Sequence, residues 1–322
     1  MRPFLLLMCL TFMCACNSQN DQPSSFIAPL KPRVYNLYPT EFVAQQAEYD
    51  KACNDIRTSQ ESTKPFARLA SVFVKEARVT GDHPYYYPAA LRVIEKGLGV
   101  DKKASELLLL KTSVLLSLHR FEEARVLAIE LCTSMPNVAT IYGMLCDANL
   151  ELGRMKEAVQ AVDVMMSLRP GLESYARVSY LRERHGDTIG ALQAMRMAVQ
   201  AGLPGTEDAA WARITYGNLL LKSHNAKAAE QQFLLARLER PNYAFAIAGL
   251  ARIEHLNKHD DMAIAMLDSA LAMVPEVSFV GLAIEIETSR NNVQRVSELI
   301  RQQAQMIQED RDAGMLAESR QR

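Results

Sequence analysis

The sequence predicts an all-α protein built from stacked pairs of antiparallel helices, and three observations lead to this prediction. Alanines recur at a nearly constant spacing, prolines recur in step with them, and apolar residues between these positions follow the helical period. Glycine (14 residues) and proline (13) are sparse in the 322-residue chain, which argues against long loops and disorder, while the low aromatic content (7%) and abundant alanine and leucine favour helices over sheets. We therefore expect one long array of helical hairpins rather than two globular domains.

Two series of residues carry the repeat, and in both the usual interval is about 34 residues. The alanine series is Ala90, Ala124, Ala158, Ala191, Ala229 and Ala263. The proline series is Pro136, Pro170, Pro204, Pro241 and Pro275. Each series has one longer interval, and it falls at the same place in both, so one short insertion around residues 204–207 explains both. Two residue types in phase predict a repeated structural unit.

The segment 122–131 indicates how one unit packs. Ala124, Leu127, Ala128 and Leu131 share one helical face, and two glutamates begin the helix, as the helix dipole favours. Alanine at the crossing point lets two helices approach closely, and a bulky residue there would cost about 1–3 kcal/mol through overpacking. Proline then ends the second helix. Because no single pair buries its apolar face, neighbouring units must stack.

These features resemble the tetratricopeptide repeat family, whose unit is two antiparallel helices with a small residue at the crossing and proline after the second helix. The matching residues in two units are Gly153, Met155, Ala158 and Pro170, and Tyr216, Gly217, Ala229, Phe233, Ala236 and Pro241. At the inner turn, where the family usually has glycine, the chain has His119, His224 and Lys258 in three units. The resemblance implies a right-handed α-solenoid, a superhelix with a concave groove that binds peptides or helices.

The sequence also predicts segments before and after the repeat array. The predicted parts are a lipoprotein signal peptide (1–16), a flexible tether (17–38), an N-terminal helix (39–62), about six helix pairs (63–277) and C-terminal capping helices (278–322). The tether is polar and contains three prolines. The capping helices are needed because the last repeat would otherwise expose its stacking face.

The first sixteen residues have the pattern of an export signal. Arg2 precedes an apolar stretch that is too short to cross a bilayer as a stable helix. The stretch ends in Met13-Cys14-Ala15-Cys16, which resembles a bacterial lipobox, although Met13 is an unusual first residue. The resemblance implies that Cys16 receives diacylglycerol and a fatty acid such as palmitate, and that the protein is lipid-anchored in the cell envelope, at the outer membrane or the periplasmic face. Ordinary signal cleavage and a retained segment are the alternatives.

The resemblance also implies which residues face the groove, because the first helix of each unit lines it. By position, the expected partner-binding residues are Asp147, Tyr180, Glu183, Trp211, Ile214, Asn218, Phe245 and Arg252. The aromatic residues would serve as anchors, and Arg252 would meet a carboxylate. The alternative for Trp211 is that it seals the junction at the longest repeat. Chaperone-binding members clamp a carboxylate with lysines and asparagines. The sequence argues against such a clamp, because the corresponding positions here are Leu109, Gly143, Ala176, Ile214 and Ala248.

The sequence contains no catalytic signature, and we expect no enzyme activity, no catalytic residue, no metal site and no cofactor. His255 and His259 lie four residues apart, but the predicted inner turn falls between them and would break a shared helix. His119, His185 and His224 also fall at inner turns, spread along one edge of the superhelix and too far apart to share a metal. A formal charge of −1 provides no field that would attract nucleic acid.

Two smaller features have alternative interpretations. Cys132 and Cys146 lie on helices that should pack together, where buried thiols are favoured over a disulfide. Tyr85, Tyr86 and Tyr87 form either an exposed contact site or a loop whose rings pack over the first helix pair, and packing is favoured.

We therefore expect a non-enzymatic scaffold or adaptor, such as an envelope assembly factor, that binds another protein or a peptide in its groove. Its other partner would be the membrane, through the N-terminal lipid, and nucleic acid is not expected. The alternatives are a structural homo-oligomer, whose groove is filled by its own tail or by a second copy, and a metal-dependent enzyme on a repeat scaffold.

Overall fold

A computed structural model describes residues 26–34, 37–59 and 61–315. This part of the chain contains fifteen α-helices and no strand. The predicted signal peptide with Cys16, the start of the predicted tether and the last seven residues lie outside the described residues, so lipidation stays a prediction. No described helix combines the length and apolar character that crossing a membrane requires.

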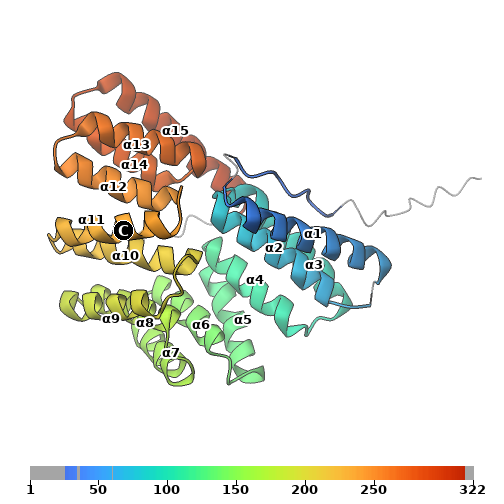
Figure 1. Cartoon of the computed structure of the whole chain (residues 1–322). Coiled ribbons are helices and arrows are strands. Elements are labelled where there is room, and N and C mark those ends of the chain that lie inside the picture. The colour runs from blue at the N-terminus through green and yellow to red at the C-terminus, as the bar shows by residue number, and fades with distance from the viewer. Residues whose placement is uncertain (1–25, 35–36, 60, 316–322) are drawn as a thin grey trace, which may run out of the picture.

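The helices follow one another from residue 39 to residue 312. Their bounds are α1 Pro39–Thr58, α2 Lys64–Thr80, α3 His83–Val100, α4 Ser105–Ser117, α5 Phe121–Ser134, α6 Ala139–Glu151, α7 Met155–Leu168, α8 Leu172–Arg184, α9 Thr188–Ala201, α10 Glu207–Lys222, α11 Ala226–Glu239, α12 Ala244–Leu256, α13 Asp260–Met273, α14 Val277–Ser289 and α15 Val293–Asp312. From α2 onward, successive helices pair as antiparallel hairpins, and the hairpins stack along a curved path (Figure 1). The predicted all-α helical-repeat solenoid is confirmed, with six helix pairs from α2 to α13 and a further pair, α14 and α15, at the end.

The hairpins pack closely because small residues stand where the helices cross. All six repeating alanines have no exposed surface. In one unit the buried ring of Phe233 on α11 lies between Gly217 of α10 and Gly249 of α12. A methyl group added to Gly249 would lie 2.7 Å from the ring, and one added to Gly217 would clash with it directly. The absence of two side chains therefore makes the space that one aromatic ring fills.

The inner turns require a left-handed backbone, the conformation that glycine adopts at the lowest cost. Gly153 and Gly186 have φ angles of 73° and 79°. His119, His224 and Lys258 occupy the same position in other hairpins with φ angles of 57°, 58° and 67°. The predicted inner turns are thus present, and three of them hold residues for which this conformation is unfavourable.

Replacing His224 or Lys258 with glycine is expected to raise the free energy of unfolding by about 0.5–1 kcal/mol, because relief of left-handed strain exceeds the added chain entropy. Both side chains are exposed, so little packing is lost. Gly153→Ala is the matched control: the added methyl group meets no atom within 4 Å, so only the strain should destabilise the protein. Urea unfolding measures all three variants, and a loss of stability in both glycine variants would contradict this account.

The segment before α1 differs from its prediction. Residues 26–34 and 37–38 are not a free tether, because they pack against the first hairpin. The Arg33 guanidinium binds the Glu76 carboxylate of α2 through two hydrogen bonds, from Nε (2.9 Å) and Nη2 (2.6 Å), and both side chains are buried. The tether was predicted from its polar and proline-rich composition. The same composition also suits an extended segment that a buried ion pair holds in place.

The tyrosine cluster lies in helix α3 and not in a loop. Tyr86 and Tyr87 are buried, and the Tyr86 ring packs 6.0 Å from the Phe73 ring. The Tyr85 hydroxyl donates to the Pro29 carbonyl, while the Lys31 amide donates to the Tyr86 hydroxyl. The rings therefore pack, as favoured, and they also hold the N-terminal segment. Cys53, Cys132 and Cys146 are free thiols in the described chain.

The first and last parts of the array contact each other. Arg78 at the end of α2 binds Glu207 and Asp208 of α10, and Arg240 after α11 binds Glu41 of α1. A methyl group at Gly81 would lie 2.6 Å from the Val274 side chain, so the α2–α3 turn also packs against the segment before α14. Figure 1 shows α15 reaching the first hairpin, where it contacts α3. The solenoid is therefore curved into a closed arrangement.

Candidate functional site: the concave groove

The concave side of the array holds a groove of about 780 Å³. Most of its lining comes from the first helices of four successive hairpins, α4, α6, α8 and α10, and Arg78 of α2 closes one side. The first helices were the ones expected to line it. Buried residues at the helix crossings hold together the hairpins that shape the groove.

Five of the eight expected groove residues line this cavity: Asp147, Tyr180, Glu183, Trp211 and Asn218. Their partner-binding role stays a prediction. Trp211 does not seal the long junction, because its side chain lines the groove and is 43% exposed.

The other three residues do not line this cavity. Ile214 is 7% exposed and packs in the core of α10–α12, because it lies off the face that carries Trp211 and Asn218. Phe245 packs between Tyr243 and Phe279, and Arg252 pairs with Glu285 of α14 at 3.7 Å. Both belong to α12, which the groove does not reach, because the contact of Arg78 with α10 closes it first.

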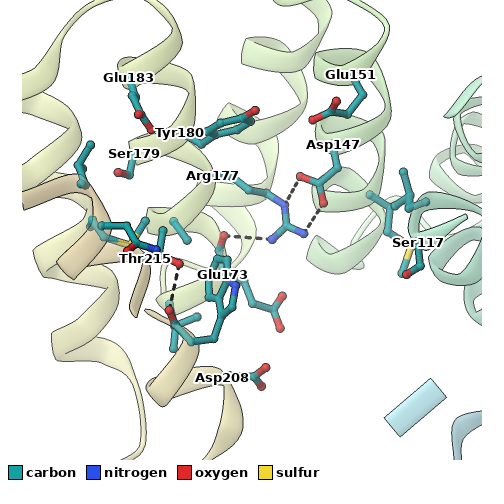
Figure 2. A pocket seen from close by; sticks show the side chains of 18 of the residues that line it. Ser117, Asp147, Glu151, Glu173, Arg177, Ser179, Tyr180, Glu183, Asp208 and Thr215 are labelled. Carbon is teal, nitrogen blue, oxygen red and sulfur yellow. Dashed lines mark hydrogen bonds and ion pairs between the residues drawn. The ribbon is translucent and has the colours of Figure 1, made fainter. Parts of the chain in front are cut away.

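Arg177 is the central groove residue that the sequence analysis missed. Its guanidinium reaches from α8 to the Asp147 carboxylate of α6, with Nε 2.9 Å from Oδ1 and Nη2 2.7 Å from Oδ2 (Figure 2). It also donates to the carbonyls of Gly143 and Glu173. Burial acts to lower the pKa of Arg177, but the charge and hydrogen bonds of Asp147 raise it above its ordinary value. This bidentate pair links two groove helices, α6 and α8.

A signal for Arg177 was present in the sequence. Gly143 stands about one repeat before Arg177, and a methyl group there would lie 3.1 Å from the Arg177 Cζ atom. Arg177 directly follows Ala176, the position that corresponds to Gly143 in the next repeat, so the missing side chain at Gly143 and the long one at Arg177 indicate a contact between neighbouring units. The sequence analysis considered Gly143 only as a position where the residues of a carboxylate clamp are absent.

Two further ion pairs involve charged side chains of the groove. Lys222 of α10 binds Glu183 of α8 at 2.7 Å, and Arg78 binds Asp208 at 2.8 Å. Figure 2 shows Glu151 and Glu183 toward one end of the cavity and Asp208 toward the other, with Arg177 between them. Among the described residues, five carboxylates line the groove, Asp147, Glu151, Glu173, Glu183 and Asp208, against three cations, Arg78, Arg177 and Lys222.

The histidines do not form a metal centre within the described residues. His255 binds Asp260 at 2.7 Å and His259 binds Glu254 at 2.8 Å, across the turn between α12 and α13. The expected break between the two histidines is therefore present. In the described part of the chain, no group of three or more histidine, cysteine or acidic side chains has the arrangement of a metal site.

The comparison with solved structures supports the fold. No family model matches the chain, and no curated protein matches it. Solved structures do match. A tetratricopeptide repeat protein from Parabacteroides merdae covers 80% of this chain and 100% of its own, with a TM-score of 0.52 and 15% identity. Yeast Tom70 covers 79% of this chain and 61% of its own (TM-score 0.56, 13% identity).

A third match is PilW, a type IV pilus biogenesis factor, which covers 61% of this chain and 90% of its own (TM-score 0.50, 15% identity). At these identities the likeness concerns the fold alone. The chain therefore has the helical-repeat fold of tetratricopeptide repeat proteins.

Proposed function

We propose that the protein is a non-enzymatic scaffold that binds a segment of another protein in its concave groove. The observation that carries the proposal is the groove itself, which is open to solvent and exposes Trp211 next to polar and charged side chains. Aromatic and arginine side chains contribute most to binding energy in protein interfaces. The helical-repeat fold supports this reading, because such arrays spend most residues on stacking and present one continuous inner surface.

The groove is suited to binding without large rearrangement. Arg177 and Asp147 join α6 to α8, Lys222 and Glu183 join α8 to α10, and Arg78 joins α10 to α2. A receptor that is already ordered loses little conformational entropy on binding, so more of the contact energy appears as affinity.

The proposal is tested by photo-crosslinking from two exposed positions. A photoreactive amino acid at Asn218, in the groove, is expected to form an adduct with one defined partner in cells that produce the protein. The same residue at Gln231, exposed on the second helix of that hairpin, is the matched control and should not form it. An adduct of the same mass from both positions, or none from Asn218, would exclude the groove as the binding surface.

We further propose that this scaffold acts in the bacterial cell envelope, as a lipoprotein anchored through Cys16. The lipobox-like segment supports this location, and PilW, a type IV pilus biogenesis factor, has a similar fold. In cells fed labelled palmitate, the wild-type chain is expected to carry the label and to sediment with membranes. Cys16→Ser should lose both properties, and its N-terminal mass should be that of the uncleaved precursor and so differ from that of the wild type. An unchanged N-terminal mass and membrane fraction in this variant would refute the anchor.

A further inference from the structure

We infer that the groove accepts a short, extended and positively charged segment of its partner protein, with a cationic side chain placed against Trp211. The inference rests on the proposed function and specifies the chemistry of the partner. It follows from the charge balance of the groove, from the pairing of its cations and from the position of Trp211.

The first argument is that the groove is acidic although the whole chain is almost neutral. Its five lining carboxylates outnumber its three cations within the described residues, whereas the full sequence has 37 acidic and 36 basic residues. A concave surface with low-dielectric walls concentrates such an excess, because less water screens the charges there. The negative field therefore faces the space that a partner would occupy.

The second argument is that every described lining cation already has a carboxylate partner. Arg177 is engaged by Asp147, Lys222 by Glu183 and Arg78 by both acidic residues at the start of α10. An acidic ligand would have to break one of these pairs to gain its own. The Glu173 side chain, by contrast, is exposed and takes part in none of these three pairs. A basic ligand gains attraction without displacing any pair.

The third argument concerns Trp211, which lies one helical turn after Asp208 on α10. Both side chains line the groove, as does Glu173 from the neighbouring α8. An indole face attracts a guanidinium or ammonium group, and adjacent carboxylates strengthen the attraction. Leu172 and Leu219 also line the groove, which provides apolar surface for the residues between two cations.

The size of the groove restricts what can enter it. A volume of about 780 Å³ is typical of sites that hold a small ligand or a few residues, and is too small for a folded domain. The contact between the first hairpin and α10 limits the space further. An extended segment of a partner fits these limits, and it presents side chains alternately to the two walls.

The test uses Trp211 as its own reporter, because it is the only tryptophan in the chain. The probes are three degenerate nonapeptide pools that carry arginine or lysine, aspartate or glutamate, or serine or glutamine at alternate positions, with aliphatic residues between. The basic pool is expected to change the Trp211 emission saturably, with an affinity at least tenfold higher than that of either other pool. The affinity should fall as salt is added.

Charge variants identify the residues responsible. Glu173→Gln combined with Asp208→Asn is expected to weaken binding of the basic pool at least tenfold. Glu130→Gln combined with Asp163→Asn removes the same charge from exposed positions on the second helices α5 and α7, and should leave binding unchanged. Circular dichroism checks that each variant is folded, and Glu173→Gln alone serves if the double variant is not.

Several results would overturn the inference: equal or tighter binding of the acidic or neutral pool, no binding of the basic pool, or equal losses in the groove and control variants. Peptide binding seen by anisotropy without a change in Trp211 emission would also overturn it. These failures differ from failure of the proposed function. If Asn218 still crosslinks a partner while the basic pool fails, only the charge preference is wrong.

Discussion

Replacing Glu76 with alanine is expected to lower the free energy of unfolding by about 3–5 kcal/mol, among the largest effects of any single substitution in this chain. The variant leaves the Arg33 guanidinium without its principal partner, although the Arg33 side chain is only 1% exposed. Glu41 and the Leu37 carbonyl remain within hydrogen-bond distance, at 3.3 and 3.2 Å. They cannot replace a buried bidentate carboxylate, so the loss should approach that of an unpaired buried charge. Urea unfolding followed by circular dichroism measures it.

Two further variants separate burial from charge. Lys31→Ala removes a more exposed ion pair, with Asp82, from the same N-terminal segment and should cost less than about 1 kcal/mol. The double variant Arg33→Met with Glu76→Leu should recover much of the stability, because a buried ion pair and an apolar pair of similar size have similar net free energies. If Glu76→Ala costs no more than Lys31→Ala, the buried pair does not hold the segment to α2.

Replacing Phe233 with alanine is expected to lower the free energy of unfolding by about 3–5 kcal/mol. The ring is completely buried between Gly217 and Gly249, so its removal leaves a cavity that two rigid helix backbones cannot close. The loss should be cooperative along the array, because each hairpin is stabilised by its neighbours. Thermal and urea unfolding measure the change, and groove binding should weaken in parallel since α10 carries Trp211.

Leu238→Ala is the matched control, because Leu238 lies on the same helix and is 75% exposed. Its replacement should change stability by no more than about 0.5 kcal/mol. Gly217→Ala should be destabilising by itself and less so in a Phe233→Leu background, where the smaller side chain leaves room for the methyl group. Equal effects of Phe233→Ala and Leu238→Ala would show that the ring does not join the two glycine-bearing helices.

The fold was predictable because its signal repeats. Ala124 is buried at a helix crossing for the same reason as Ala158 and Ala229, and each copy in the sequence strengthens the reading of the others. The left-handed turn at Lys258 was likewise predictable from the position of glycine in other units. Such contacts lie within one hairpin or between neighbouring hairpins. The residues that make them therefore recur in the sequence at an interval of one repeat.

The candidate site was only partly predictable. Trp211 and Asn218 line the groove, as expected for residues on the first helix of a hairpin. Ile214 packs in the core instead, because the exact face of a helix depends on how its neighbours rotate it. Arg177 was missed because Gly143 was considered only as a possible clamp position, and because its partner Asp147 lies on another helix, where charge pairing has no fixed spacing in the sequence.

The sequence by itself determined the helices, their pairing, the small residues at their crossings and the inner turns, because all of these depend on local periodicity. Only the tertiary structure decided that Arg240 meets Glu41, 199 residues away, and that Arg78 closes the groove at α10. That closure is the sum of small rotations between successive hairpins. No single repeat specifies this sum, so the length of the groove, and the exclusion of Phe245 and Arg252 from it, appear only when the whole array is assembled.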